Sequence, residues 1–450
     1  MKICIIIVDC LRSDHLGCYG YSKNTSPKID RIADRCVRCE NVYAQSNWTY
    51  PSVYAMLTGR YPSVLSVQWF DQKINSAFKM LPEQLADIGY QTSIFSNFKV
   101  LLNERGFCSH FNEVKDVGVD RNAFDVFSQW LKENNDAFCF FHIGEYVHEP
   151  YFAPDSLVKN FTDEATIPEQ TRNSKLMQVM TSRETTGNDL RKTIGRINKG
   201  LQSPSAEEID LLLAHYDAGI AYIDGIVAGL HDLLSGHGDD YLFFLTADHG
   251  QAFMEHGYFG HGLSLYNEVL KVPLIIDYAG KYQGNIEANL QLADLYPTIL
   301  DCVGMESDGD LNGVSFWDGL DTGITKERTI LSEGFPGVSI IRNQHKLISA
   351  YSKYWTIKSI YRRFMQHSKT ASWPRLVYSY LQRYRKVQLF DVASDPGERM
   401  NITRKQKDIQ RALNQELDTI MKTVLDESLP AEAVHMDKEI EEQLVNLGYL

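Results

Sequence analysis

Short apolar segments that end in acidic or histidine side chains constrain the fold of this chain more than any other feature. Residues 3–8 read ICIIIV and are followed by Asp9. Residues 241–247 read YLFFLTA and are followed by Asp248 and His249. Such segments are typical of strands buried on both faces of a parallel sheet. Because ligands bind beyond the carboxyl ends of such strands, the sequence predicts an α/β fold with these side chains at one edge.

The pattern of elements predicts two domains. The expected elements are strands at 92–96, 137–143, 272–277, 328–332 and 338–350 and helices at 76–89, 206–235 and 404–424. We expect an α/β domain over residues 1–325 and a smaller α+β domain over residues 326–450. Residues 155–205 are polar and poor in pattern, which indicates an inserted loop or lid.

Adjacent carboxylate and imidazole groups, as in Asp248-His249-Gly250, can both turn toward one divalent cation. Alone, this motif is more typical of a turn with an Asx cap and a satisfied histidine. Asp9 alone is typical of a helix cap. The presence of both segments in one chain favours a metal site.

Thr49 precedes a helical run at residues 53–57, and Pro51 falls in its first turn. This position predicts that Thr49 is an N-cap residue. A hydroxyl at a helix N-terminus faces the positive end of the helix dipole, and contact with a metal makes its alkoxide accessible near neutral pH. Together with Asp9, Asp248 and His249, we interpret Thr49 as a nucleophile rather than a cap alone.

At this point the chain resembles the sulfatase family, within the alkaline phosphatase superfamily, nearly from end to end. The matching motifs are Val8-Asp9-Cys10-Leu11-Arg12-Ser13-Asp14-His15, Thr25-Ser26-Pro27, Trp48-Thr49-Tyr50-Pro51-Ser52, Leu57-Thr58-Gly59-Arg60, His148-Glu149-Pro150-Tyr151, Thr246-Ala247-Asp248-His249-Gly250, Glu255-His256-Gly257, Val272-Pro273-Leu274, Gln388-Leu389-Phe390-Asp391, Asp395-Pro396-Gly397-Glu398 and Leu447-Gly448-Tyr449-Leu450. The resemblance implies a large mixed, mostly parallel sheet sandwiched by helices, with a smaller C-terminal α+β domain.

The resemblance also implies roles for individual residues. A divalent metal would be held by Asp9, Thr49, Asp248 and His249. His148 would act near the leaving group or on an ester oxygen, and His261 would grip a non-bridging oxygen or a second metal. Asn97 would contact the anionic head group of the substrate. Such a set suits a tetrahedral oxyanion ester, which needs charge neutralisation, a nucleophile and a proton for the leaving oxygen.

Two positions depart from the family pattern. Cys10 stands where many members carry a second Asp, which makes the site less suited to Ca²⁺ and opens it to Zn²⁺ or Mn²⁺. The ion stays open among Ca²⁺, Mg²⁺, Mn²⁺ and Zn²⁺. Thr49 and Val53 replace the Cys or Ser and the Arg of the formylglycine motif. A threonine nucleophile resembles the phosphodiesterase and nucleotide pyrophosphatase branch and the phosphoethanolamine transferases.

Other titratable residues have alternative interpretations. His142 ends an apolar run and either faces the site or is a satisfied core histidine. Glu145 and His148 follow on the next loop and could reach a second metal. His256 is expected to pack within a loop. Surface or capping roles are expected for two acidic residues of the long helix, Asp217 and Asp224.

Composition and charge limit the kinds of molecule and compartment that we expect for this protein. The chain has 450 residues and a net charge of −13, which argues against a nucleic-acid-binding protein. We expect no transmembrane segment, because no apolar run approaches the roughly 20 residues that span a bilayer. A first strand at residue 3 predicts a cytoplasmic protein without a secretory signal. The eight cysteines are expected to be reduced core residues, and the lone Cys36/Cys39 pair favours no zinc or redox site.

Residues 351–390 contain nine Lys or Arg and no Asp or Glu, interleaved with aromatic residues. This pattern indicates amphipathic helices with a solvated basic face. Its alternatives are a collar that attracts a polyanionic substrate and a surface that meets anionic lipid.

The sequence therefore predicts a metal-dependent hydrolase of sulfate or phosphate esters, in which Thr49 attacks the ester. The expected substrate is a sulfated or phosphorylated small molecule, glycan or lipid head group. Three alternatives stay open: a phosphodiester or phosphonate monoester hydrolase, a phosphoethanolamine-type transferase, and a non-catalytic binding protein on the same scaffold. The intact set of Asp9, Thr49, Asp248 and His249 argues against the last.

Overall fold

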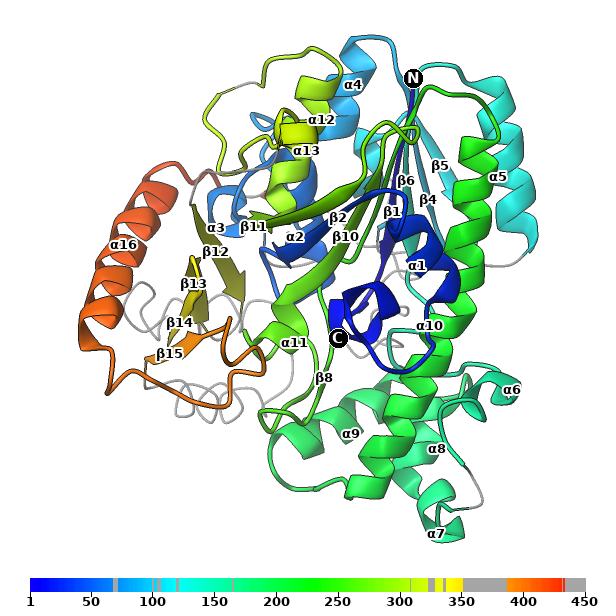
Figure 1. Ribbon diagram of the computed structural model, residues 1–450, viewed down its shortest axis with the longest axis vertical. Helices are drawn as coiled ribbons and strands as arrows, with labels where there is room; N and C mark the ends of the chain where they lie inside the picture. Colours follow the sequence, from blue (N-terminus) through cyan, green and yellow to red (C-terminus); the bar gives the residue numbers. More distant parts are fainter. Residues whose placement is uncertain are drawn as a thin grey trace.

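The structure is a computed structural model. It describes residues 1–67, 72–98, 101–102, 107–118, 121–163, 166–307, 309–322, 328–334, 337–350, 387–430 and 432–433. Its centre is an eight-stranded sheet with helices on both faces, and a four-stranded sheet lies to one side (Figure 1). Similar layers were expected from the sequence, so the predicted α/β fold class is confirmed.

The large sheet is mixed but mostly parallel. Its strands lie in the order β11 (Gly284–Gln291), β2 (Val37–Tyr43), β10 (Lys271–Asp277), β7 (Tyr241–Thr246), β1 (Lys2–Val8), β6 (Ala137–Ile143), β4 (Gln91–Ser96) and β5 (Glu113–Asp116). Only β10 runs antiparallel to its neighbours in this sheet. The strands β7, β1 and β6 therefore end at the same edge.

The register of the three central strands brings their carboxyl ends level. Lys2 of β1 lies opposite both Ala137 of β6 and Tyr241 of β7. At the other end, the Asp9 amide donates a hydrogen bond to the Ile143 carbonyl at 2.9 Å, which continues the β1–β6 ladder by one residue. The residues that follow β1, β6 and β7 consequently meet in one place.

Helices cover both faces of the large sheet (Figure 1). One face carries α1 (Pro27–Ala33), α5 (Arg121–Glu133) and α10 (Ala206–Ser235), and the other carries α2 (Thr49–Thr58), α4 (Leu81–Asp87) and α12 (Leu295–Cys302). The shorter elements are η1 (Ser13–His15), η2 (Gly17–Tyr19), α3 (Pro62–Leu65), β3 (Gln72–Lys73), η3 (Phe107–His110), β8 (Ala252–Phe253), β9 (Phe259–Gly260), α11 (Asn267–Leu270), η4 (Leu292–Asp294), α13 (Gly319–Thr322) and β16 (Glu432–Ala433).

One predicted helix was too long. Residues 76–89 were expected to be helical, but α4 begins at Leu81, after Met80 with an extended backbone. Pro82 lies in the first turn of α4, where its missing N–H costs nothing.

The helix α10 forms over the predicted bounds. Ser205 and Glu208 make a capping box at its start. By length and composition α10 is long and apolar enough to cross a membrane, which differs from the expectation that no segment would be. Within the described residues 72% of its most apolar window is buried inside the protein, as in the core helix of a globular domain.

The acidic residues of α10 are structural. Asp224 accepts hydrogen bonds from the backbone amides of Lys28 and Ile29, so it caps α1, as a capping role predicted. Asp217 is fully buried and binds His15, and therefore a surface position was the wrong interpretation.

The inserted region at residues 155–205 is more ordered in secondary structure than its sequence indicated. It contains the helices α6 (Asp155–Val158), α7 (Glu169–Arg172), α8 (Lys175–Thr181) and α9 (Gly187–Asn198). The first three pack against α10 and α9 contacts β9 (Figure 1). The helices α6, α7 and α8 have at most seven residues and take their order from packing. The longer α9 carries a helical pattern at Leu190, Ile194 and Ile197, which the sequence analysis missed.

The C-terminal domain consists of an antiparallel sheet and one long helix. Its strands are β12 (Thr329–Gly334), β13 (Gly337–Arg342), β14 (His345–Ala350) and β15 (Gln388–Asp391), in that order, with α16 (Lys407–Asp426) packed on β13 and β14. Residues 338–350, expected as one strand, form a hairpin that turns at Asn343, whose φ of 53° suits the left-handed region. The basic segment lies outside the described residues, except for residues 387–390.

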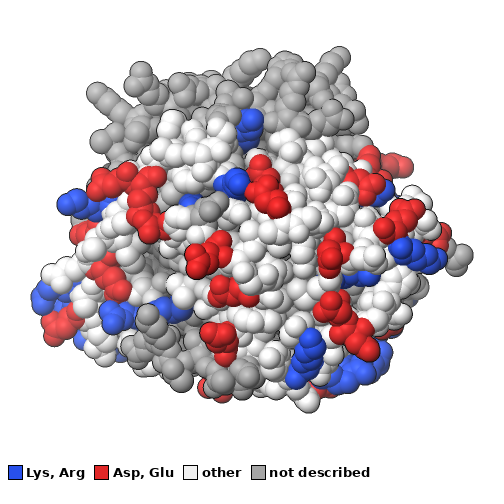
Figure 2. All heavy atoms as spheres, turned by 90° about the horizontal axis from the view of Figure 1, so that it is seen from above, with Lys and Arg blue, Asp and Glu red and all other residues white. Residues whose placement is uncertain are grey.

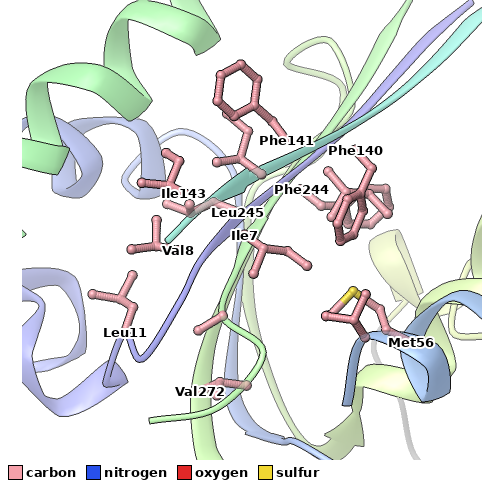
Figure 3. Packing of buried hydrophobic residues seen from close by; sticks show 14 of the residues in the cluster. Ile7, Val8, Leu11, Met56, Phe140, Phe141, Ile143, Phe244, Leu245 and Val272 are labelled. Atoms are coloured by element: carbon pink, nitrogen blue, oxygen red, sulfur yellow. The ribbon is translucent and has the colours of Figure 1, made fainter. Parts of the chain in front are cut away.

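The core of the large domain lies on both faces of the sheet. Figure 3 shows Ile7, Phe141, Ile143 and Leu245 packed around the central strands. Leu245 is 0% exposed. Burial of such side chains removes apolar surface from water and is the main favourable term that holds the edge of the sheet in place.

We expect Leu245→Ala to lower the free energy of unfolding by about 2–5 kcal/mol, because a cavity remains where the side chain packed. Equilibrium unfolding in urea measures the change. Leu201→Ala is the matched control, since Leu201 is 65% exposed. Equal losses in the two variants would contradict the assignment of Leu245 to the core.

His256 links the two domains. Its Nδ1 lies 2.8 Å from Glu268 Oε1, its Nε2 lies 3.2 Å from the Glu398 carbonyl, and its ring stacks on Tyr266 at 3.6 Å. Burial alone would lower the pKa of His256, but the hydrogen bond to the Glu268 carboxylate raises it above the usual 6.5. The predicted packing role is confirmed.

Because the folded pKa is raised, the His256 ion pair stabilises the fold fully below about pH 6.5, and this part is lost as the pH rises through the folded pKa. We expect a loss of about 1 kcal/mol or less, because the desolvation of both groups offsets most of the attraction in a pair whose side chains are only 12% and 5% exposed. Thermal unfolding between pH 6 and 9 should show it. The loss should disappear in His256→Gln and persist in His237→Gln, which alters an exposed histidine.

Figure 2 shows one face of the molecule on which acidic and basic side chains are interspersed. Among the described residues on this face, no continuous basic patch is present. This distribution fits the net charge of −13.

Candidate active site

Four side chains predicted to act together do meet at the carboxyl edge of the sheet. Thr49 Oγ1 lies 3.4 Å from Asp9 Oδ2 and 3.3 Å from His249 Nε2. The same His249 nitrogen lies 3.4 Å from Asp248 Oδ2 and 3.7 Å from Asp9 Oδ1. All four residues are at most 3% exposed.

His142 joins this group from β6. Its Nε2 lies 3.6 Å from Asp9 Oδ2, and the ligand atoms of Asp9, His142 and Asp248 all lie within 4.8 Å of one another. The sequence left open whether His142 faces the site or the core. In the structure His142 faces the site. It lies opposite Ile7 in the β1–β6 ladder, and Ile7 precedes Asp9 by two residues on the same chain segment.

The carboxylates of this group fit a cation. Asp9 Oδ1 and Asp248 Oδ2 are buried and accept no hydrogen bond. Burial raises the pKa of Asp248, and the charge of Asp9 raises it further. Burial would also raise the pKa of Asp9, but His142, whose Nε2 lies 3.6 Å from Asp9 Oδ2, and the other nearby histidines hold it below its usual range. Two buried carboxylates side by side are costly unless a positive charge lies between them.

The histidines are oriented as metal ligands usually are. The Nδ1 atom of His249 lies 2.9 Å from the Gly250 carbonyl, and that of His142 lies 3.3 Å from Ser96 Oγ. When Nδ1 carries the proton and donates it to such a group, the lone pair of Nε2 points into the site. Both Nε2 atoms face the carboxylates.

Thr49 is the first residue of α2, not its N-cap. Trp48 has the extended backbone of an N-cap residue, with φ −159° and ψ 160°. The Thr49 hydroxyl is therefore turned away from the helix amides and toward Asp9 and His249. It still lies at the positive end of the α2 dipole, which favours an anionic oxygen there.

Close packing fixes the loop that carries Asp248 and His249. The Ser52 hydroxyl on α2 donates a hydrogen bond of 2.6 Å to the Asp248 carbonyl. A Cβ atom at Gly250 would lie 2.3 Å from the Glu268 carbonyl oxygen, so only glycine fits. Glycine is thus needed as the third residue of Asp248-His249-Gly250, so that this loop can pack closely against the backbone at Glu268.

A second group of potential ligands lies beside the first. It consists of Cys10, His148, Glu149 and His261, whose ligand atoms lie within 4.8 Å of one another. Cys10 also forms a group with Asp9 and His249. The His261 ring lies 4.6 Å from that of His249 and 4.9 Å from that of His148. His148 and His261, which the resemblance assigned to the leaving group or an ester oxygen and to a non-bridging oxygen or a second metal, respectively, therefore adjoin the first group.

The histidines of the second group differ in basicity. Burial lowers the pKa of His261 to about 3, and the neighbouring His249 lowers it too. Burial also acts to lower the pKa of His148, but Glu149 and Asp9 together raise it above its usual value. Burial and the charge of Asp9 raise the pKa of the Cys10 thiol.

Sequence reasoning missed Glu149 and Gln251. Gln251 donates to Glu149 Oε2, and its Oε1 lies 3.0 Å from His261 Nδ1. Glu145, expected near a second metal, instead accepts a hydrogen bond of 2.6 Å from Asn97. The signal for Glu149 was its position next to His148. Contact of Asn97 with a substrate stays a prediction.

The sequence model of the sulfatase family matches residues 2–305, which include all of these residues. The chain belongs to the sulfatase family. Members of this family depend on a metal, and the described residues contain the groups that could bind one. The predicted family and the predicted class, an ester hydrolase, are thus confirmed.

Curated relatives and solved structures agree with this family. N-acetylglucosamine-6-O-sulfatase of Bacteroides thetaiotaomicron is 23% identical over 392 residues, which cover 69% of each chain. Human arylsulfatase K is 29% identical over 226 residues, which cover 48% of this chain and 38% of that protein. The chain thus spans well under half of arylsulfatase K.

Two solved structures share the fold over almost their whole length. A protein solved in complex with its substrate D-glucosamine-2-N,6-O-disulfate has a TM-score of 0.68 at 19% identity, covering 94% of this chain and 98% of that chain. Phosphonate monoester hydrolase of Agrobacterium radiobacter has a TM-score of 0.69 at 16% identity, covering 97% of this chain and 100% of that chain.

We expect a divalent cation to stabilise the protein and Asp248→Asn to change this in two ways. Without a cation the variant should unfold at a higher temperature than wild type, because one of two adjacent buried charges is gone. With Mn²⁺ or Zn²⁺ the free energy of unfolding of the variant should rise less than that of wild type. For wild type, a free cation concentration of 100 times Kd raises it by about 2.7 kcal/mol. Thermal unfolding after chelation and refilling measures both effects.

The control is Asp408→Asn, which alters a side chain that is 95% exposed. It should behave as wild type in both conditions. A full cation response in Asp248→Asn would show that Asp248 is not a ligand.

Proposed function

We propose that this protein hydrolyses a sulfate ester, with Thr49 as the nucleophile in a centre formed by Asp9, Asp248 and His249. The observation that carries this proposal is the Thr49 hydroxyl, 3.4 Å from Asp9 Oδ2 and 3.3 Å from His249 Nε2, at the start of a helix. A divalent cation bound by these residues would supply positive charge to the ester oxygens and lower the pKa of the hydroxyl.

The reaction has two displacements at sulfur. In the first, Thr49 Oγ1 bonds to sulfur, the bond from sulfur to the leaving alcohol breaks, and the threonine proton moves toward Asp9 Oδ2, its recorded acceptor. The leaving oxygen needs a proton or positive charge. His148 and His261 lie beside the centre to meet that need, and the alcohol takes its proton from His148 or from water.

In the second displacement, water attacks the threonine sulfate. The bond from sulfur to Thr49 Oγ1 breaks, sulfate leaves, and Thr49 recovers a proton from Asp9. The proton released by the attacking water replaces the one given to the alcohol. The sum is one ester anion and one water converted to one alcohol, one sulfate dianion and one proton released to solvent, with the protein unchanged.

The relatives support a sulfated sugar as substrate. The names of two of them state action on, or binding of, sulfate groups of glucosamine derivatives. The identity of 23% over 69% of the chain supports the reaction class more than the sugar. We propose a sulfated carbohydrate as the first class to screen.

A second candidate function is hydrolysis of a phosphonate or phosphate ester. The observation that favours it is Thr49 itself, because a threonine is not converted to formylglycine and Val53 replaces the arginine of that motif. The likeness in fold to a phosphonate monoester hydrolase is compatible with it. A transferase, in which an alcohol replaces water in the second displacement, uses the same residues.

We expect Thr49→Ala to lower kcat/KM by about 10³-fold or more, because the covalent route is lost. Thr49→Ser should retain activity, since it keeps the hydroxyl. The substrates are p-nitrophenyl sulfate, p-nitrophenyl phosphate and p-nitrophenyl phenylphosphonate, each with added Mg²⁺, Mn²⁺, Ca²⁺ or Zn²⁺. The preferred ester decides between the two candidates.

Thr58→Ser is the matched control, because Thr58 ends the same helix and its hydroxyl donates to the Tyr54 carbonyl at 2.7 Å. It should keep wild-type rates. Unchanged activity in Thr49→Ala would overturn the nucleophile assignment. If wild type cleaves none of the esters but binds a cation, the transferase or the binding protein gains weight.

A further inference from the structure

Two polar side chains, Glu145 and Asn97, lie at the carboxyl edge of the large sheet beside His142. Glu145 follows β6 by two residues and Asn97 follows β4 directly, and these two strands pair in parallel. The residues next to them touch the His142 ring. Ser96 Oγ lies 3.3 Å from His142 Nδ1, and a Cβ atom at Gly144 would lie 3.0 Å from His142 Cε1. Since Nε2 of the same ring lies 3.6 Å from a carboxylate of the candidate metal site, the pair borders that site.

The Glu145 carboxylate has no basic partner in the part of the chain that the structure describes. Its hydrogen-bond donor is the Asn97 amide, whose Nδ2 lies 2.6 Å from Glu145 Oε1, and no described Lys or Arg forms an ion pair with it. Both side chains are half-buried, so Oε2 of Glu145 is open to solvent. Glu145 therefore presents a carboxylate with a free oxygen at the border of a site that takes an anionic ester.

A tight turn holds Glu145 in this place. The Val147 amide donates to the Glu145 carbonyl at 2.9 Å, and Tyr146 between them has a φ of 71°. This combination is typical of the rare, strained form of the γ-turn. The turn packs against α10, where a Cβ atom at Gly219 would lie 2.2 Å from the Tyr146 carbonyl oxygen, so only glycine fits. Strain of this kind persists where the surrounding structure fixes a functional position.

A carboxylate at this border distinguishes substrates by the groups that their alcohol part carries. A hydroxyl or ammonium group can donate a charge-assisted hydrogen bond to it, which is stronger than a bond between neutral groups. A second anionic group, such as a carboxylate or an N-sulfate, is repelled, and the repulsion is stronger in a half-buried place than in water. Because the Asn97 amide holds Glu145 Oε1 near the end of β4, the discrimination acts at a fixed position.

We propose that Glu145, held by Asn97, is a specificity-determining residue of this protein. It accepts a hydrogen bond from a hydroxyl or ammonium group of the substrate and disfavours substrates that carry a second anionic group at that position. This role rests on the proposed function and narrows the substrate class to a sulfated sugar with a free hydroxyl or amino group near the ester. The protein should then differ from the relative whose substrate is D-glucosamine-2-N,6-O-disulfate.

The test compares two sugars that differ in one charged group, D-glucosamine 6-sulfate and D-glucosamine-2-N,6-O-disulfate, with added Mn²⁺ below neutral pH. Under these conditions the amine of the monosulfate is an ammonium group, whereas the disulfate carries an N-sulfate. Wild type should cleave the monosulfate with a kcat/KM that is higher by about tenfold or more. Glu145→Gln should lower kcat/KM for the monosulfate and raise it for the disulfate. A merely structural defect would lower both.

Two further variants isolate the charge of Glu145. Glu145→Asp keeps the carboxylate and should keep the preference for the monosulfate. The matched control is Glu133→Gln, because Glu133 also accepts a side-chain amide hydrogen bond of 2.6 Å, from Gln129, but lies at the end of α5, just before β6 begins. This control should keep the wild-type ratio of kcat/KM for the two sugars.

Binding measurements separate the role of Glu145 from the proposed function. In the Thr49→Ala background, which lacks the nucleophile, calorimetry should give a lower Kd for the monosulfate than for the disulfate, and Glu145→Gln should reduce the difference. This result, without turnover of p-nitrophenyl sulfate by wild type, would support the role of Glu145 while the proposed function fails. A wild-type preference for the disulfate, an unchanged ratio in Glu145→Gln, or binding of neither sugar would overturn the role.

Discussion

The parallel pairing of β1 with β6 and β7 is the constraint on which the site depends. Each pair shares the same starting register at Lys2, so the strands end together. Apolar side chains on both faces make this register rigid, because a slip by one residue would turn buried side chains to the other face. Asp9, His142 and Asp248 are held close only because three chain segments, far apart in sequence, stop at one level.

The second domain contributes to this site through the loop before Thr49. The Ser332 hydroxyl and the Glu333 amide, on β12, donate to the carbonyls of Ala44 and Gln45 at 2.7 and 2.8 Å. Two residues further along, the Asn47 carbonyl accepts a hydrogen bond of 2.7 Å from the Gly262 amide, beside His261. The loop between β2 and α2 is therefore fixed from two sides, and this fixes the hydroxyl that α2 presents.

Buried charge and metal chemistry are two aspects of one arrangement here. A site with several buried carboxylates and few basic partners is destabilising in the empty protein, because desolvation opposes each charge. The same arrangement would favour a bound cation, since folding has already brought the carboxylates together. Cys10, the residue after Asp9, has a φ of 65° in the left-handed region, and the Tyr216 hydroxyl holds this turn by donating a hydrogen bond to the Cys10 carbonyl. The same buried carboxylates thus lower the stability of the protein without a cation and form its candidate active site.

The sequence by itself determined the fold class and the group of Asp9, Thr49, Asp248 and His249, because strongly apolar strands mark where a parallel sheet ends. It missed β2 and β11, which lie at one side of the sheet and mix apolar with polar residues. Only the tertiary structure brought Cys10, Glu149 and His261 together with His148. These residues stand on irregular loops, whose course is set by packing and by hydrogen bonds such as those of Gln251 rather than by any periodic pattern.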